Sequence, residues 1–221
     1  MVMPAESTLV AASRRTADIF LAIVGLAIAI PVIAVIGLFL ALQDGLPVFF
    51  RQVRVGRDGR PFQLLKFRSM RVNACGAQVT SEGDSRITPL GAFLRRYKFD
   101  ELPQLWNVLR GDMSLIGPRP EVPRYVSAAD PRWRRVLAHR PGITDFATLL
   151  FRDEERLLAQ QADPEQFYRE QILPAKLALN VEYLDRRSIW SDFKLIILTF
   201  RYSFFPSTLD ATSVREAILS R

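Results

Sequence analysis

The stretch "IFLAIVGLAIAIPVIAVIGLFLAL", residues 19–42, contains no charged or strongly polar side chain over 24 positions. An α-helix rises about 1.5 Å per residue, so this stretch is long enough to cross the roughly 30 Å hydrocarbon core of a bilayer. It is too long for the apolar part of a signal peptide, and no small-residue cleavage site follows it. We therefore expect a membrane-associated helix that is retained in the protein.

Proline interrupts this apolar run near its middle. Pro31 follows Ile30, and a proline inside a helix removes one backbone hydrogen bond and clashes with the preceding turn, so a kink or a break is expected there. Arg14, Arg15 and Asp18 precede the run, and the chain after it is also rich in arginine. Because both flanks are basic, the positive-inside rule favours neither orientation. A full span and a re-entrant hairpin broken at the proline, with both ends on one face of the membrane, both remain open.

Composition narrows the kinds of partner and chemistry. The chain has 221 residues and a formal net charge of +7, which suits one main domain with an anionic partner such as nucleic acid, lipid headgroups or a phosphorylated substrate. Cys75 is the only cysteine and His139 the only histidine. This excludes disulfide frameworks and zinc sites of the Cys/His kind, and we expect neither residue to have a catalytic role.

The chain after the apolar run predicts an α+β domain made mostly of helices. Residues 49–55 and 61–70 flank a Gly-Arg-Asp-Gly turn and alternate in part between apolar and basic side chains, which indicates a β-hairpin. Residues 71–89 are polar and contain glycine, as is typical of a loop. Helical patterns follow in residues 90–99, 101–109, 131–140, 153–161, 164–173 and 174–187.

Two further segments each allow two interpretations. The arginines of the hairpin form either a face turned to solvent or lipid headgroups, or a phosphate-binding face. Residues 191–205 are apolar over a length too short to span a membrane, so they form either a core helix or an interfacial helix. Six aromatic residues between positions 190 and 205 suit the interfacial alternative.

Two adjacent acids stand in the stretch "KFDELPQLWNVLRGDMSLIGPRP", residues 98–120. Asp100 falls where a helix N-cap belongs, with Glu101 in the first turn and Pro103 at an early position, which is a complete structural explanation. The same helix terminus would also suit phosphate, with Glu101 as a ligand for Mg²⁺. The spacing alone does not separate cap from catalyst.

The chain resembles the bacterial sugar transferases of the monotopic polyprenyl-phosphate phosphoglycosyl transferase family. The matching stretches are "RRTAD", "PVFFRQVRVGRDGRPFQLLKFRSM", "DELPQLWNVLRGDMSLIGPRP", "RPGIT" and "VEYLDRRSIWSDFKLIILT". They cover nearly the whole chain in order, and the long central block is highly specific. The short N-terminal part resembles the minimal catalytic form of the family.

The resemblance implies a reaction. Members of the family transfer a sugar-1-phosphate from a nucleotide diphosphate sugar, usually a UDP-sugar, to undecaprenyl phosphate and release UMP, which begins the assembly of a bacterial glycan. The aspartate of the Asp-Glu pair forms a covalent phosphosugar intermediate, and the reaction uses Mg²⁺. Carried over by motif, Asp100 is the nucleophile and Glu101 the Mg²⁺ ligand.

The resemblance and the charge of a diphosphate together suggest the substrate-binding residues. Cationic side chains offset the crowded negative charge in phosphoryl transfer. The candidates around the diphosphate or nucleotide are Lys66, Arg68, Arg95, Arg96 and Arg119, with Gln104, Pro118 and Pro120 beside them. Arg119 stands between two prolines on stiff backbone, which suits fixed recognition of an anion.

The family also implies a membrane topology. Residues 1–46 would form a re-entrant helix hairpin broken at Ile30 and Pro31 and anchored by Arg14, Arg15 and Asp18, and residues 47–221 would form a catalytic domain on the cytoplasmic face of the inner membrane. The partners are then a UDP-sugar, undecaprenyl phosphate and membrane lipids, without nucleic acid, and a homodimer is compatible with this. The alternative is a bitopic membrane anchor whose basic domain serves as a scaffold or binds nucleic acid.

Two positions depart from the family pattern. Asp145 follows "RPGIT", where the family often has glycine, and the segment after it also differs. Residue 30 is isoleucine, where some members have serine, so a hydroxyl that could satisfy the backbone freed by Pro31 is absent. The first departure concerns the acceptor or sugar pocket and leaves the Asp-Glu pair untouched.

Overall fold

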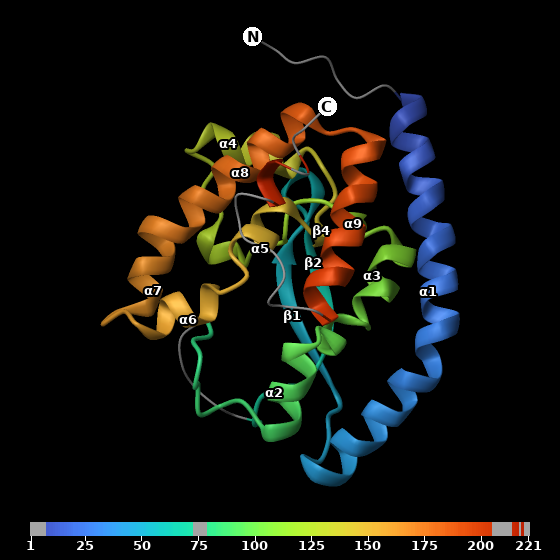
Figure 1. Ribbon diagram of the computed structural model, residues 1–221, viewed down its shortest axis with the longest axis vertical. Coiled ribbons are helices and arrows are strands. Elements are labelled where there is room, and N and C mark those ends of the chain that lie inside the picture. The colour runs from blue at the N-terminus through green and yellow to red at the C-terminus, as the bar shows by residue number, and fades with distance from the viewer. Residues whose placement is uncertain (1–7, 73–78, 205–213, 217, 219–221) are drawn as a thin grey trace.

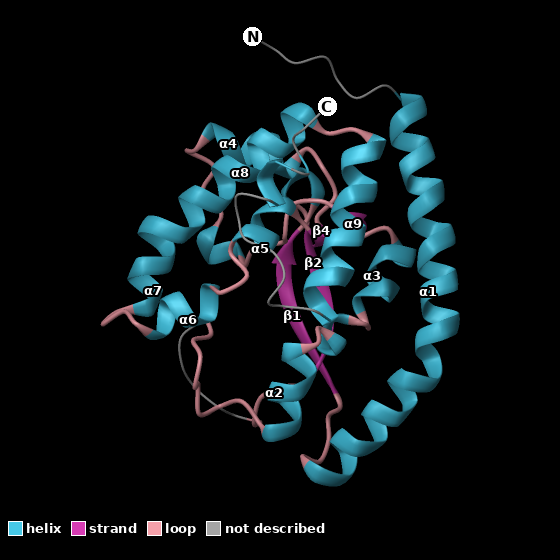
Figure 2. Ribbon diagram, in the orientation of Figure 1, coloured by secondary structure: helices cyan, strands magenta, loops and turns pink. Residues whose placement is uncertain are grey.

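The computed structural model describes residues 8–72, 79–204, 214–216 and 218 (Figure 1). The helices are α1 (Thr8–Gln43), α2 (Pro89–Arg96), α3 (Gln104–Arg110), α4 (Pro131–Leu137), α5 (Phe146–Leu150), α6 (Glu154–Ala159), α7 (Pro164–Phe167), α8 (Leu173–Arg186) and α9 (Ile189–Phe204). The strands are β1 (Phe49–Val55), β2 (Pro61–Phe67), β3 (Ser114–Ile116) and β4 (Gly142–Thr144), and the short turns are η1 (Arg57–Gly59), η2 (Phe99–Glu101), η3 (Pro123–Tyr125) and the π-helical η4 (Tyr168–Ile172). The predicted α+β class with mostly helical content is confirmed (Figure 2). Cys75 lies outside the described residues.

Helix α1 is the long apolar helix that the sequence predicts, and it runs along one side of the domain (Figure 1). It continues through Pro31 as one helix, so of the kink or break expected at Ile30 and Pro31 the structure shows no break. A proline removes one hydrogen bond, but the bonds of the neighbouring turns keep the helix intact. The axis instead changes direction in the C-terminal half of α1, as expected for a kink (Figure 1). The re-entrant topology stays a prediction.

The N-terminal part of α1 is fastened to the domain by the residues that we expected to anchor a membrane hairpin. Arg15 donates to the carbonyl oxygens of Val108, at 2.7 Å, and Leu109, at 3.1 Å. These carbonyls belong to the C-terminal end of α3, where helical carbonyls lack intrahelical partners. Asp18 accepts a hydrogen bond from the backbone N–H of Leu115 at 3.0 Å. The "RRTAD" stretch therefore docks α1 onto α3 and the start of β3.

Arg68 fastens the other end of α1. Its guanidinium donates to the carbonyl oxygens of Asp44 and Gly45, each at 2.7 Å. The Asp44 carboxylate in turn accepts a hydrogen bond from the Thr88 hydroxyl at 2.9 Å. In this arrangement the Arg68 side chain is buried beside the C-terminal end of α1, and its Nε and Nη1 have no hydrogen-bond partner among the described residues, so its contact with the diphosphate stays a prediction.

Strands β1 and β2 form the predicted antiparallel hairpin, with Phe50 opposite Lys66. Phe67 at the end of β2 is buried against Leu40 of α1 and Leu94 of α2, so the apolar helix and the hairpin share one core cluster. Phe99, the first residue of η2, packs against the same cluster. The element that carries the two acids is thereby supported by α1 and β2.

A second sheet was not predicted. Strands β3 and β4 pair in parallel, with Ser114 opposite Gly142 and Ile116 opposite Thr144. The last three residues of "RPGIT" form β4. Strands of three residues are too short to show a sequence period, and parallel partners lie far apart in the chain. This pair brings the Pro-Arg-Pro segment beside the start of α5.

Helix α9 packs into the core, as one interpretation of the last apolar segment predicted, and the interfacial interpretation stays a prediction. Leu195 is fully buried in the core cluster that includes Phe146 and Tyr183. On other faces of the helix, Trp190 and Phe200 are 61% and 64% exposed. One side of α9 is therefore a core face and another is an exposed apolar face, as expected of a helix that lies at a membrane interface.

Candidate active site

The two acids lie in a single turn of 3-10 helix, η2, directly after α2. Lys98 precedes this turn with φ of 60°, in the left-handed region that non-glycine residues seldom adopt. Asp100 and Glu101 are 4% and 8% exposed. A buried carboxylate pair behind a strained lysine is costly to build, and such features cluster at functional sites.

Asp100 does not cap a helix. Helix α3 begins at Gln104 with Pro103 at the N-cap position, and no side chain caps either α3 or η2. Asp100 Oδ1 is buried and accepts no hydrogen bond within the part of the chain that the structure describes. The cap hypothesis is therefore wrong, because the chain reaches α3 through a 3-10 turn and keeps this oxygen free of backbone N–H groups. A buried, unpartnered carboxylate oxygen suits a ligand or a reacting atom.

Glu101 is held by two cations from distant parts of the chain. Lys66 Nζ of β2 lies 2.9 Å from Glu101 Oε1. Arg119 donates from Nη2 to Oε1 at 2.6 Å and from Nη1 to Oε2 at 3.4 Å. The predicted residues Lys66, Glu101 and Arg119 are thus brought together, with Asp100 next to them.

Burial and these cations shift the pKa values of the two carboxyl groups in opposite directions. Burial raises the pKa of Asp100, the Lys66 cation opposes this rise, and the Glu101 carboxylate adds to it. Burial also disfavours ionised Glu101, but Arg119 and Lys66 outweigh it and hold the pKa of Glu101 well below its usual range. Burial lowers the pKa of Lys66 to about 8. Opposite shifts in adjacent carboxyl groups are typical of acid-base and nucleophilic sites.

Arg119 is held by close backbone packing around the Pro-Arg-Pro segment. Gly117 donates to Thr144 O at 3.1 Å, and Gly142 donates to Pro118 O at 3.0 Å. A Cβ on Gly117 would meet Arg140 O at 2.3 Å, and one on Gly142 would meet Gly117 N at 2.1 Å, so both positions require glycine for close approach. The sequence requirement for glycine here follows from backbone contact between β3 and β4.

The other side of the segment is tied to β1. Arg54 donates to Pro120 O at 2.9 Å, and Val55 N–H donates to Glu121 O at 2.9 Å. The Glu121 carboxylate accepts a hydrogen bond from the Tyr168 hydroxyl at 2.6 Å. Burial raises the pKa of Tyr168, and the negative charge of Glu121 raises it further, so the hydroxyl keeps its proton and remains a donor. The Pro-Arg-Pro backbone is therefore fixed from both sides.

The other predicted binding residues, Gln104, Arg95 and Arg96, lie in different environments around the two acids. Gln104 is 1% exposed, and its Nε2 donates no hydrogen bond among the described residues, so it offers a donor within the first turn of α3. Arg95 is ion-paired with Glu155 and contributes its charge to the surroundings of Asp100. Arg96 is exposed at the end of α2 with its guanidinium over the ring of Tyr97, and its contact with substrate stays a prediction.

Three residues around the candidate site escaped sequence analysis. Lys98 is the first residue of the stretch that carries the two acids, and its positive charge acts to lower the pKa of both. Glu121 and Tyr168 brace the arginine segment from 47 positions apart. Neither the left-handed backbone of Lys98 nor the hydrogen bond between Tyr168 and Glu121 produces a periodic pattern in the sequence. The only signal in the sequence was the positive charge of Lys98 close to the two acids.

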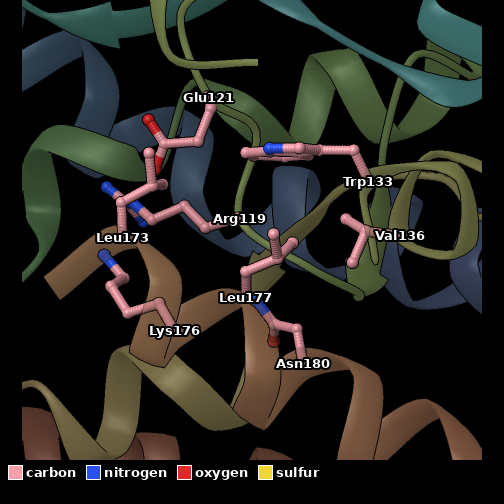
Figure 3. Close-up of a pocket in the computed structure, with 8 residues that line it drawn as sticks. All are labelled: Arg119, Glu121, Trp133, Val136, Leu173, Lys176, Leu177 and Asn180. Carbon is pink, nitrogen blue, oxygen red and sulfur yellow. The ribbon is translucent and has the colours of Figure 1, made fainter. Parts of the chain in front are cut away.

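A small cleft borders Arg119 between the Pro-Arg-Pro segment and helices α4 and α8 (Figure 3). Trp133 of α4 and Leu177 of α8 face each other across it. Asn180 Oδ1 is buried in this wall and has no hydrogen-bond partner among the described residues. The cleft therefore combines apolar walls with the guanidinium of Arg119, which pairs with Glu101, and with the unpartnered amide oxygen of Asn180.

The donor set fits Mg²⁺ only with help from a substrate. Mg²⁺ usually takes one or two carboxylates together with phosphate oxygens and waters. Asp100 and Glu101 supply two carboxylates, and Asp100 Oδ1 is an available oxygen. No group of three or more His, Cys, Asp or Glu side chains with metal-binding geometry occurs among the described residues. The pair suits a metal that arrives with phosphate, and not a cage built by protein alone.

Known proteins resemble this chain over most of its length. The sequence profile of the family described as bacterial sugar transferase matches residues 9–206. Galactosyl transferase CpsE of Streptococcus agalactiae serotype III is 37% identical over 205 residues, which are 86% of this chain and 42% of that protein. The UDP-glucose:undecaprenyl-phosphate glucose-1-phosphate transferase of Caulobacter vibrioides is 36% identical over 191 residues, 84% of this chain and 67% of that protein.

The Escherichia coli (strain K12) protein of the same name is 37% identical over 196 residues, 84% of this chain and 39% of that protein. The chain thus spans between 39% and 67% of the length of these three relatives. The matched region, residues 9–206, includes α1, the hairpin, both acids and the Pro-Arg-Pro segment. This chain belongs to the bacterial sugar transferase family.

Proposed function

We propose that this protein transfers a sugar-1-phosphate from a UDP-sugar to undecaprenyl phosphate and releases UMP, as the first membrane step of glycan assembly. The observation that carries the proposal is the buried Asp100 with its unpartnered Oδ1, next to a Glu101 that is held by Lys66 and Arg119. The printed names of two relatives describe undecaprenyl-phosphate glucose-1-phosphate transferases, which supports the same substrate classes here.

The proposed chemistry has two displacements at one phosphorus atom. Asp100 Oδ1 attacks the sugar-bearing phosphorus, an oxygen–phosphorus bond forms, and the bond to the bridging oxygen breaks so that UMP leaves. A phosphate oxygen of the polyprenyl acceptor then attacks the same phosphorus, and the bond to Asp100 breaks and restores the carboxylate. Covalent catalysis divides one displacement between two anions into two easier steps.

Lys66 and Arg119 have a second task in this scheme. In the structure both side chains form ion pairs with Glu101. When a diphosphate enters, their N–H groups can turn to its oxygens and stabilise the charge that spreads over them in the transition state. Mg²⁺, held by Glu101 and Asp100 together with substrate phosphate, would supply further positive charge to the diphosphate.

We propose that the protein acts at the cytoplasmic face of the bacterial inner membrane. Helix α1 exposes large apolar side chains such as Phe20, Ile28 and Leu38, and α9 adds exposed Trp190 and Phe200. In the re-entrant topology, residues 1–46 enter and leave on the cytoplasmic side, and residues 47–221 form the catalytic domain there. The phosphate of the lipid acceptor would then lie at the level of the domain.

Release of UMP tests the activity. The full chain in membranes or nanodiscs is incubated with undecaprenyl phosphate, Mg²⁺ and each member of a panel of UDP-sugars, and UMP is quantified. We expect UMP and a lipid-linked diphosphate sugar with at least one donor, loss of both products with EDTA, and recovery with added Mg²⁺. No UMP from any donor would contradict the transferase, and unchanged activity in EDTA would contradict the metal.

Labelling of single cysteines tests the topology. Leu9 lies in the first turn of α1, Leu46 follows the end of this helix, and the two residues are 83% and 75% exposed. In a Cys75→Ser background, Leu9→Cys and Leu46→Cys should both resist a membrane-impermeant maleimide added to intact spheroplasts and react in inside-out vesicles. Labelling of position 9 from the periplasmic side would favour the bitopic anchor and exclude the re-entrant hairpin.

A further inference from the structure

Asp145 is a buried carboxylate that departs from the family sequence and has no role in the scheme above. It follows β4, begins α5, and is 1% exposed. Its Oδ1 accepts the backbone N–H of Thr148, which is an ordinary N-cap bond. Its Oδ2 accepts the backbone N–H of Arg119 at 2.5 Å. One carboxylate therefore joins the start of α5 to the segment that carries the active-site arginine.

Among the described residues, the other aspartates whose side chains cap a helix, Asp130 and Asp163, accept hydrogen bonds from residues two and three positions away. Asp163 caps α7 by accepting only the nearby Gln166 N–H, at 2.9 Å, and is part of an exposed helix end. Asp145 instead uses its second oxygen on a residue 26 positions away. A helix cap needs only one oxygen, so local structure does not account for the contact with Arg119.

The backbone of the Pro-Arg-Pro segment explains why the contact between Asp145 and the Arg119 N–H affects the position of Arg119. Proline has no N–H, so Pro118 and Pro120 cannot be fixed by donating hydrogen bonds. The Arg119 N–H is the one backbone donor between Gly117 and Glu121. A bond from this N–H to a carboxylate is charge-assisted and stronger than one to a neutral acceptor. It sets the position of the Cα from which the guanidinium reaches Glu101.

We propose that Asp145 is a positioning residue, which fixes the Arg119 backbone so that its guanidinium meets Glu101 and the donor diphosphate. This inference rests on the proposed function. Charge from Asp145 also favours the cationic form of Arg119 at the site, after the larger effect of Glu101. Small misplacements of a binding group, near 1 Å, cost on the order of 10²-fold in rate.

Steady-state kinetics of Asp145→Gly give the first test. Glycine is a tolerable N-cap, so α5 should lose little stability, whereas the Arg119 N–H loses its acceptor. We expect kcat/KM for the UDP-sugar to fall by about 10- to 100-fold, by analogy with misplaced groups in other active sites. The matched control is Asp163→Gly, which removes a cap far from Arg119 and should change kcat/KM less than about 2-fold.

A double-mutant cycle separates positioning from general damage. Residues that act through one another give non-additive effects. In an Arg119→Ala background no guanidinium is left to misplace, so adding Asp145→Gly should lower the remaining activity less than about 2-fold. Multiplied losses in the double variant would overturn the proposal, because Asp145 would then act independently of Arg119.

An NMR measurement tests the contact without requiring activity. In protein labelled with ¹⁵N-arginine, the Arg119 amide is identified by its loss in Arg119→Ala. Its proton should resonate downfield in the wild-type chain and shift upfield in Asp145→Gly. An unmoved Arg119 amide would overturn the inference. If the wild-type chain releases no UMP, the proposed function fails while this shift still reports on the contact.

Discussion

Asp100→Asn should abolish UMP release by the full chain, with a fall of at least about 10⁴-fold in kcat, as for other removed nucleophiles. The asparagine has nearly the same size and keeps one carbonyl oxygen, but it cannot form the bond to phosphorus. A radiolabelled sugar phosphate should attach covalently to the wild-type chain in the absence of acceptor and should not attach to the variant. Product formation and mass spectrometry of the trapped protein measure the two effects.

The stability of the same variant excludes misfolding as the cause. Asp100 Oδ1 is buried without a hydrogen bond and burial raises the pKa of this group, so the ionised form is costly to bury. A neutral amide should leave the free energy of unfolding unchanged or raise it by about 1 kcal/mol. The thermal midpoint in detergent should therefore not fall. Substantial UMP release by a stable Asp100→Asn chain would rule out Asp100 as the nucleophile.

Arg119→Ala should lower kcat/KM by about 10³-fold, the scale found when one preorganised charge-stabilising donor is removed. The guanidinium is the stronger of the two cations on Glu101, with two N–H groups directed at its two oxygens. Without it, Glu101 keeps only Lys66, and the diphosphate loses a planar, bidentate partner. Arg119→Lys should recover part of the loss as a point charge, and single-turnover rates give the effect on the chemical step.

A surface arginine is the control for this substitution. Arg135 of α4 is exposed and paired with Asp185 of α8, and such pairs contribute little to stability. Arg135→Ala should retain activity within about 2-fold while removing the same side-chain charge. Equal losses in Arg119→Ala and Arg135→Ala would show that net charge, and not placement at Glu101, is what the activity requires.

Sequence analysis found the parts of this protein that depend on local pattern. The apolar run predicted α1, the turn between two alternating stretches predicted the hairpin, and periodic apolar positions predicted most of the later helices. The matching motifs also selected Asp100, Glu101, Lys66 and Arg119, which the structure brings together. The family that these motifs suggested is the family to which the chain belongs.

Only the tertiary structure showed which partners the candidate residues have. Arg68 and Arg119 both seemed suited to phosphate, yet Arg68 closes the end of α1 and Arg119 meets Glu101. Asp100 occupied a plausible cap position, but the chain adopts a 3-10 turn there and Oδ1 of Asp100 has no hydrogen-bond partner among the described residues. Asp145 was only a departure from a pattern until its oxygen was seen on Arg119.

The division has a physical cause. A periodic pattern of apolar residues or a turn can be recognised within one element, because the residues that form it lie only a few positions apart in the sequence. The partners of Glu101 come from 35 and 18 positions away, and Arg54 reaches Pro120 across 66. Which cation meets which anion depends on how β2, η2 and the β3–β4 pair pack together. The sequence alone determined the elements and the chemical types of residue, and packing decided which of those residues form the site.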